Sequence, residues 1–228
     1  RPSYFGAPTG REEEWRFTPL RRMEPQLSQL AIRGGATVEI DGDPSVIGVD
    51  AAAGPIQPGE WLVPVDVVSA FAWAGAPEMT LITIPAKTDL EEPVTVTITG
   101  TSTSYQNVRV TIEHDSSATV VINHQGTGQH AENIEVEVGA RSQLKLVVIQ
   151  DWDRDAVHLG RIHSHVGRDA TLTQVVATFG GDLVRLVSTV DYDGPGGSAE
   201  LLGAFFADAG QHLEHRLFVD HNAPHCRS

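Results

Sequence analysis

Residues 107–114 read NVRVTIEH and residues 133–138 read NIEVEV. Apolar and polar side chains alternate along both stretches. In the second stretch the three apolar residues point to one side, while Glu135 and Glu137 point to the other. This period of two predicts β-strands with one face in a core and the other face toward solvent.

The strand pattern recurs along the chain. One series of apolar positions has gaps of 26, 25, 25 and 29 residues: Val108, Ile134, Leu159, Val184 and Leu213. A second series has gaps of 24, 28 and 29 residues: Val120, Leu144, Leu172 and Leu201. Repeats of this length with two strands each are typical of stacked coils, because one coil cannot bury its inward side chains alone. We therefore expect an all-β fold, either a parallel β-helix or, as the alternative, an antiparallel sandwich.

Composition narrows the classes of function. The 228 residues carry a formal net charge of −14, and no basic patch offsets it, which argues against nucleic-acid binding. The sequence contains no apolar run of eighteen residues, so we expect no membrane span. A single cysteine excludes an internal disulfide framework and fits a reducing compartment such as the cytoplasm.

Three zones follow from the pattern. Residues 1–33 form an irregular N-terminal lead-in, residues 34–84 form a mixed region rich in Gly, Pro and Ala, and residues 85–228 form the β-helix core. In the lead-in, Thr9 and Glu12 have the spacing of a capping box for a short helix. In the mixed region, VDVVSAFAWA at 65–74 has a helical apolar face.

Two histidines in the core are candidates for a metal site. His163 and His165 lie two apart on an expected strand, so both leave the same face, as in a cupin-type site. Asp169 is the only carboxylate close to them along the chain. Because Ile162 and Val166 occupy the opposite, core-facing side, we expect the two histidines to be solvated rather than to bind a metal.

The last eighteen residues, QHLEHRLFVDHNAPHCRS, hold four of the ten histidines and the one cysteine. By strand parity His215 lies among apolar neighbours, which predicts a buried, hydrogen-bonded histidine. His225 and Cys226 are adjacent and diverge in an extended segment, so they suit a Cys–His catalytic pair poorly. His225 and Cys226 are the candidate metal ligands, although a single cysteine is more commonly a small buried residue of the core.

Other enzyme classes find less support. The sequence has neither a glycine-rich phosphate loop nor a G-x-S-x-G elbow. An acidic β-helix suits a carbohydrate-active enzyme, and Asp151, Asp153 and Asp155 could supply its carboxylates. A solvated turn explains those three residues equally well.

Five segments, in order, resemble the SufB/SufD family of iron–sulfur cluster assembly proteins. The first segment, PTGREEEWRFTPLRRM, resembles the N-terminal part of SufD and favours SufD over its paralogue SufB. The others follow the shared core: IPAKTDLEEPVTV, VGARSQLKLVVIQDW, FGGDLVRL and DGPGGSAELLGAFFADAGQHLEHRLFVDHNAPHCRS. The resemblance covers nearly all of the chain.

The resemblance implies a right-handed parallel β-helix that pairs with a SufB-like subunit and is bound by a SufC-like ATPase. It implies a scaffold and not an enzyme, with no cofactor of its own. A transient iron–sulfur cluster or iron would lie at the interface between the SufB-like and SufD-like subunits.

In the family, further coils and a SufC-binding helical region follow the H-N-x-P-H-C-x-S motif. We therefore expect a C-terminally truncated chain whose uncovered last coil self-associates. We also expect at most weak iron binding, through His225 or Cys226.

Overall fold

The computed structural model describes residues 2–23, 36–43, 48–53 and 63–228. Within these ranges one α-helix and three short 3-10 helices accompany the strands: η1 (Pro2–Tyr4), η2 (Glu13–Trp15), η3 (Leu20–Arg22) and α2 (Val67–Gly75). The strands are β1 (Ala36–Asp41), β2 (Gly48–Ala53), β3 (Glu78–Ile84), β4 (Val94–Gly100), β5 (Ser104–Ile112), β6 (Ser117–Gly126), β7 (Gln129–Val138), β8 (Gln143–Trp152), β9 (Val157–Val166), β10 (Thr171–Thr178), β11 (Leu183–Tyr192), β12 (Ser198–Phe205) and β13 (His212–Asp220). The expected boundary between residues 33 and 34 lies outside the described residues.

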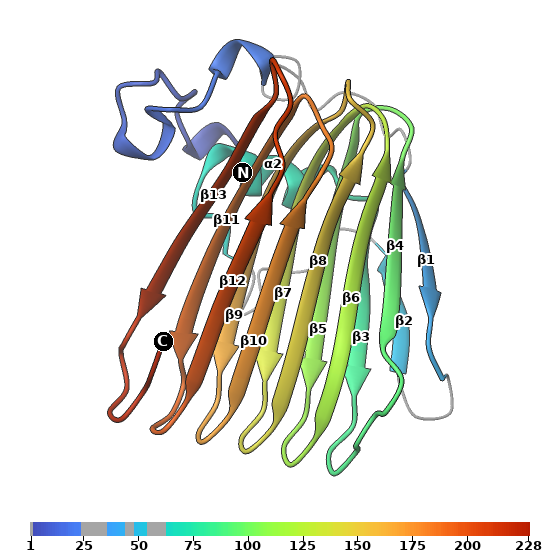
Figure 1. The fold of residues 1–228 in the computed structure, drawn as a ribbon, viewed down its shortest axis with the longest axis vertical. Helices are drawn as coiled ribbons and strands as arrows, with labels where there is room; N and C mark the ends of the chain where they lie inside the picture. The colour runs from blue at the N-terminus through green and yellow to red at the C-terminus, as the bar shows by residue number, and fades with distance from the viewer. Residues whose placement is uncertain (1, 24–35, 44–47, 54–62) are drawn as a thin grey trace.

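The strands form two facing sheets, one in front of the other in Figure 1. One sheet has the order β1-β4-β6-β8-β10-β12, and the other has the order β13-β11-β9-β7-β5-β3-β2. Pairing is parallel throughout, except that β1 joins β4 and β2 joins β3 in antiparallel fashion. From β3 onward, successive strands therefore alternate between the sheets, which confirms the parallel β-helix and rules out the antiparallel sandwich.

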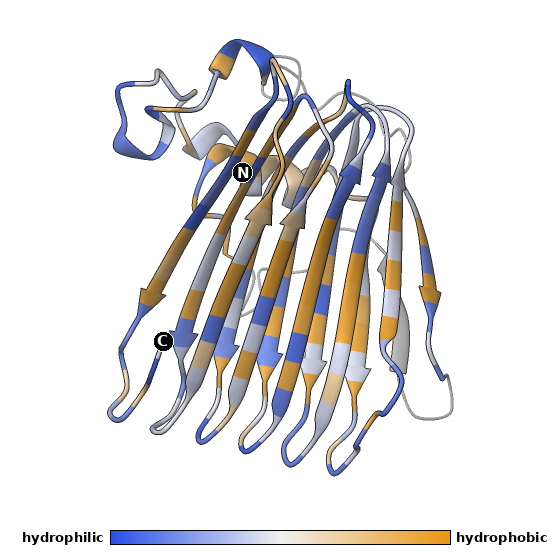
Figure 2. Cartoon of the chain, in the orientation of Figure 1, coloured by the Kyte–Doolittle hydropathy of each residue, from blue (hydrophilic) through white to orange (hydrophobic). Residues whose placement is uncertain are grey.

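The main core lies between the two sheets. Along β4 every second side chain is buried, and Val96 and Ile98 are fully inaccessible to solvent; Figure 2 shows the corresponding orange and pale bands. The inward residues of neighbouring coils stack on one another in a continuous cluster. Each fully buried aliphatic side chain contributes about 1.5–3 kcal/mol relative to an exposed one, so stacking is the main source of stability.

The structure confirms the repeat, but several of the predicted registers are wrong. Val108 pairs with Ile134 as expected, whereas Ile134 pairs with Ile162 and not with Leu159. Leu159 is buried on the outer face of its sheet, against a second core. Because apolar residues occupy both faces of β9, its hydrophobic pattern alone could not determine which face is inward. In the other series Leu144 does pair with Leu172, but the two flanking members are each two residues out of register.

Helix α2 covers the outer face of the second sheet and confirms the helix expected at 65–74. Asp66 caps it, because its carboxylate accepts a hydrogen bond from the Ser69 backbone N–H at 2.7 Å. Asn133 is fully buried beneath the helix and donates to the Ser69 carbonyl at 3.0 Å and to Asn107 Oδ1 at 2.9 Å. Asn107 in turn donates to the Ala72 carbonyl at 3.3 Å. These two asparagines satisfy helix carbonyls that burial against the sheet removes from water.

The N-terminal segment, residues 2–23, lies beside β11 and β13 in Figure 1. Thr9 Oγ1 donates to Glu12 Oε1 at 2.8 Å, but the expected capping box does not form: the following 3-10 turn begins at Glu13, and its N-cap residue Glu12 makes no side-chain capping bond. The guanidinium of Arg185 stacks 3.9 Å from the centre of the Trp15 ring and donates to the Glu14 carbonyl at 3.1 Å. Two further contacts join the segment to β13: Arg216 donates to the Glu14 carbonyl, and Thr18 donates to Glu214.

Arg185→Ala is expected to release this segment while leaving the coils intact. Both Arg185 and Trp15 are buried, and a desolvated cation–π contact is worth about 2 kcal/mol. Hydrogen exchange of residues 2–23 should therefore accelerate by at least about 10-fold, since about 1.4 kcal/mol corresponds to that factor. Arg154→Ala is the matched control, because Arg154 forms an exposed ion pair with Asp208. Equal exchange rates in the two variants would contradict the prediction.

Candidate functional site

His163 and His165 lie on the outer face of β9, opposite the core residues Ile162 and Val166, as expected. They are not solvated, however: their side chains are only 12% and 13% exposed. The prediction of solvated histidines was wrong because it considered carboxylates along the chain and not those of the adjacent coils.

Carboxylates from the coils on both sides surround these histidines. His163 Nδ1 lies 3.3 Å from Glu135 on β7, and its Nε2 lies 2.7 Å from Asp191 on β11. The guanidinium of Arg161 donates to Glu135 Oε1 at 3.1 Å. These groups are between 26 and 28 residues apart in sequence, which is one coil. Together with the ion pair between Arg109 and Glu137, these groups form a row of paired charges across β5, β7, β9 and β11, the outer charge row.

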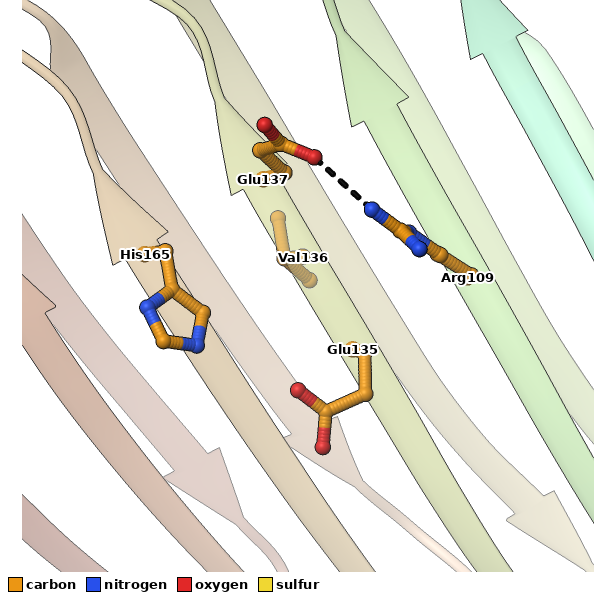
Figure 3. Close-up of a pocket in the computed structure, with 5 residues that line it drawn as sticks. All are labelled: Arg109, Glu135, Val136, Glu137 and His165. Atoms are coloured by element: carbon orange, nitrogen blue, oxygen red, sulfur yellow. Dashed lines mark hydrogen bonds and ion pairs between the residues drawn. The ribbon is translucent and has the colours of Figure 1, made fainter. Parts of the chain in front are cut away.

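Figure 3 shows one end of this row. Arg109 of β5 donates to Glu137 of β7 at 2.9 Å, and Glu135 and His165 lie beside that ion pair. The shallow depression between them has no room for a bound small molecule. The row therefore suits the joining of coils, or contact with a partner surface, better than the binding of a substrate.

The charge row makes stability depend on pH. Burial acts to lower the pKa of His163, but its hydrogen bonds to Glu135 and Asp191 outweigh burial and raise the pKa above the ordinary 6.5. Arg161 opposes this effect. The folded protein thus holds this proton more tightly than the unfolded chain does.

Wild-type protein is therefore expected to lose stability relative to His163→Gln as pH rises from about 6 to about 9. The stabilisation is fully present below the unfolded pKa and is lost as pH passes through the folded pKa. The measurement is the unfolding midpoint of both proteins across this range. A gap between the two proteins that does not change with pH would contradict the assignment.

The residues of the C-terminal stretch are spread over the last coil. His215 faces inward, and its Nε2 lies 2.8 Å from Thr178 Oγ1, which confirms the expected hydrogen bond, but the residue is half-buried and not fully buried as expected. Burial lowers the pKa of His215. Cys226 is half-buried against the main core, with its Sγ 3.6 Å from the Gly194 carbonyl, whereas His225 is exposed. Neither belongs to a group of three ligand-type side chains within the described ranges. Iron binding by His225 or Cys226 stays a prediction.

A second cluster, which the sequence analysis did not identify, lies inside the helix between the two sheets. His124 of β6, Glu132 of β7 and His158 of β9 all point inward, and their side chains are at most 1% exposed. Their ligand-type atoms all lie within 4.8 Å of one another. These three residues are the interior histidine cluster.

The surroundings of the cluster are aromatic and buried. The ring centres of His124 and His158 are 5.0 Å apart, and that of Trp152 lies 5.2 Å from His158. Burial holds the pKa of His158 well below its ordinary value and lowers the pKa of His130, which is also buried here, to about 4. Burial acts to raise the pKa of Glu132, but the adjacent His124 outweighs it and lowers that pKa. Glu132 is therefore an ionised carboxylate next to two histidines, His130 and His158, that burial keeps neutral.

One signal in the sequence could have revealed the cluster. His124 is in register with Gln150, and His130 is in register with His158, so polar residues recur at inward positions one coil apart. Polar inward positions that stack in this way mark either a hydrogen-bond network or a binding site.

Comparisons with known proteins give consistent results. A family model described as "SUF system FeS cluster assembly, SufBD core domain" matches residues 95–228. An iron–sulfur cluster assembly SufBD family protein of Mycobacterium bovis is 43% identical over 228 residues, which cover 98% of this chain and 57% of that protein. A protein of the same description from Mycobacterium leprae is 38% identical, with 98% of this chain and 58% of the relative covered. The chain thus spans somewhat more than half the length of these relatives.

Proposed function

The chain belongs to the SufBD family of iron–sulfur cluster assembly proteins, and we propose that it serves there as a non-catalytic, SufD-like scaffold subunit. In this proposal it pairs with a SufB-like paralogue, a SufC-like ATPase binds the pair, and the cluster is built at the interface between the paralogues. The observation that carries the proposal is the family match over residues 95–228, which covers most of the stacked coils.

An exposed apolar surface lies on the last described coil. Within the described residues, β12 and β13 are the last strands of their sheets, so most of each outer backbone edge has no neighbouring strand, although Arg227 pairs with Ser198 at the start of β12. Large apolar side chains between 48% and 71% exposed lie on and next to these strands: Leu202, Phe205, Phe206, Leu217 and Phe218. We call these five residues the apolar terminal surface, with Leu202 and Phe218 pointing outward from opposite sheets. Apolar area of this kind is normally covered by protein, and self-association of the 228-residue chain is expected where nothing else covers it.

A cytoplasmic location is part of the same proposal. The chain has one cysteine, which suits a reducing compartment. Among the described helices, none has both the length and the apolar composition that crossing a bilayer requires.

Co-expression tests the proposal. The protein in its full-length form is produced with SufB-like and SufC-like proteins from the same host, and one affinity tag on it is used for purification. A complex of all three proteins is expected. Purification of the tagged protein alone would remove the main support for the scaffold role.

A pair of variants of the 228-residue chain tests the surface. Phe206→Glu places a charge on the apolar terminal surface at a residue that is 71% exposed and stacks on Phe179. Self-association measured by sedimentation should weaken by at least about 10-fold, as for a hot-spot aromatic residue. Thr37→Glu, an exposed position on β1 at the opposite end of the coils, is the control and should leave self-association unchanged. Unchanged self-association of Phe206→Glu would contradict the assignment of this surface.

A further inference from the structure

Two polar atoms of the interior histidine cluster lack hydrogen-bond partners among the described residues. These are His158 Nε2 and Glu132 Oε1, both inaccessible to solvent. A buried polar atom without a partner is costly, and native proteins seldom keep one without a reason. The scaffold role makes no use of this cluster.

Trp152 determines where the protons of the cluster lie. An indole N–H can only donate, and Trp152 Nε1 lies 2.6 Å from the side-chain oxygen of Gln150. This fixes the orientation of the Gln150 amide. The same oxygen lies 2.5 Å from His158 Nδ1, which must therefore carry a proton and donate it. A neutral His158 consequently has a lone pair on Nε2.

The other end of the Gln150 amide fixes the second histidine. Gln150 Nε2 donates to His124 Nδ1 at 3.0 Å. The proton of a neutral His124 is then on Nε2, which donates to Glu132 Oε2 at 2.7 Å. The carboxylate receives this one hydrogen bond.

A lone pair and an anion thus face each other inside the core. His158 Nε2 lies 3.7 Å from Glu132 Oε2, which is too far for a hydrogen bond, and neither atom supplies a proton to the other. Two acceptors in a medium of low dielectric repel each other. A cation between them would convert this repulsion into attraction.

We propose that His124, Glu132 and His158 bind one divalent transition-metal ion between the two sheets. Bonds of about 2.0–2.2 Å to a tetrahedral ion require ligand atoms about 3.3 Å apart. The ligand atoms already lie within 4.8 Å of one another, so side-chain movements that shift each ligand atom by about 1 Å bring them to the required separation. Two imidazoles and one carboxylate are a ligand set for Zn²⁺ or Fe²⁺ and not for Ca²⁺ or Mg²⁺.

When a metal binds to His124 Nε2, the imidazole proton can be carried by Nδ1. Coordination through Nε2 moves the imidazole proton to Nδ1, and the Ile149 carbonyl lies 3.2 Å from Nδ1 as its acceptor. A metal-bound histidine whose other N–H donates to a backbone carbonyl or carboxylate is the common arrangement. The hydrogen bond from His158 Nδ1 to Gln150 stays unchanged, but the one from Gln150 Nε2 to His124 Nδ1 is lost, so the His124 ring must turn toward the Ile149 carbonyl. No proton leaves the site.

The outer charge row is a poorer metal site, although Glu135, His163 and His165 also lie close together. Both ring nitrogens of His163 already lie next to carboxylates. The guanidinium of Arg161 occupies one oxygen of Glu135 and would repel a cation. Because the inference uses only the interior atoms, it stands independently of the scaffold role.

Metal content tests the proposal. The protein is expressed in medium supplemented with Zn²⁺ or, anaerobically, Fe²⁺, because the ion must enter while the coils close. The desalted protein is analysed by inductively coupled plasma mass spectrometry, and its unfolding midpoint is compared with and without strong chelator. About one ion per chain and a lower midpoint after chelation are expected. Wild-type protein without stoichiometric metal would overturn the proposal.

Variants locate the ion. Glu132→Gln and His158→Gln should each reduce the metal content to less than about a tenth. Loss of a residue that merely supports a ligand lowers metal affinity by about 10-fold or more, and loss of the ligand itself should lower it at least as much. If Glu132→Gln does not fold, His158→Gln carries the test alone. The control is His163→Gln with His165→Gln, which should retain the full ion and the full effect of chelator. Loss of the ion in this control, or its retention in both cluster variants, would overturn the assignment.

Discussion

Gly126→Ala is expected to lower the unfolding midpoint by roughly 6–12 °C, which corresponds to about 3 kcal/mol for a chain of this size. Gly126 ends β6 and has a φ of +90°, where a side chain is strained. A Cβ there would also lie 2.2 Å from the backbone oxygen of Gly100, its register partner in the preceding coil. That oxygen accepts a hydrogen bond from the Thr127 backbone N–H at 3.0 Å. In the variant, the coil that contains Gly126 must therefore move away from the coil that contains Gly100 at this turn.

Gly210→Ala is the control for this prediction. Gly210 has nearly the same φ, +89°, but a Cβ there would meet nothing within 4 Å. Its substitution costs only the backbone strain, about 1 kcal/mol at the low end of the range for such residues. Thermal unfolding of both variants separates strain from steric overlap. Equal changes in midpoint would show that the neighbouring coil yields to the added carbon.

Glu135→Ala is expected to cost about 3–5 kcal/mol in the free energy of unfolding, because it leaves the guanidinium of Arg161 buried without its carboxylate. The side chains of Glu135 and Arg161 are 3% and 8% exposed, and their ion pair measures 3.1 Å. His163 loses a carboxylate at the same time. Denaturant unfolding of the single variant provides the measurement.

A double variant shows that the cost comes from the unpaired charge. Glu135→Leu together with Arg161→Met removes both charges and keeps apolar volume, so it should cost less than the sum of the single changes. The two residues are in contact, so a coupling free energy between about 0.5 and 3 kcal/mol is expected. A cost below about 1 kcal/mol for Glu135→Ala would mean that water reaches the pair in solution.

Alternation within a strand and recurrence between strands were sufficient to predict an all-β repeat, because both follow from stacking. The family resemblance, and not the pattern alone, favoured the parallel β-helix over the antiparallel sandwich. The pattern was not sufficient for the register. In β9, Leu159 and Ile162 are both buried but on opposite faces, since a helix covers the outside of that sheet. A pattern that counts apolar residues cannot separate two cores that lie on the two sides of one strand.

The same limit applies to the candidate sites. His163 and His165 were found because they are neighbours along the chain, but their carboxylate partners come from other coils. His124, Glu132 and His158 are spread over 35 residues and meet only after three strands have stacked. Only the register, and not local spacing, brings such residues together.

The contacts between the N-terminal segment and β11 and β13 have a consequence for the order of events during synthesis. Thr18 meets Glu214, 196 residues later, so the partner of the first segment is among the last parts of the described chain to be made. At about 5–20 residues per second, the ribosome needs about 10–40 s to reach it. During this interval the early coils can stack in sequence while Trp15 stays undocked. The contacts of the N-terminal segment with β11 and β13 then form as a late step, after the coils have stacked one by one.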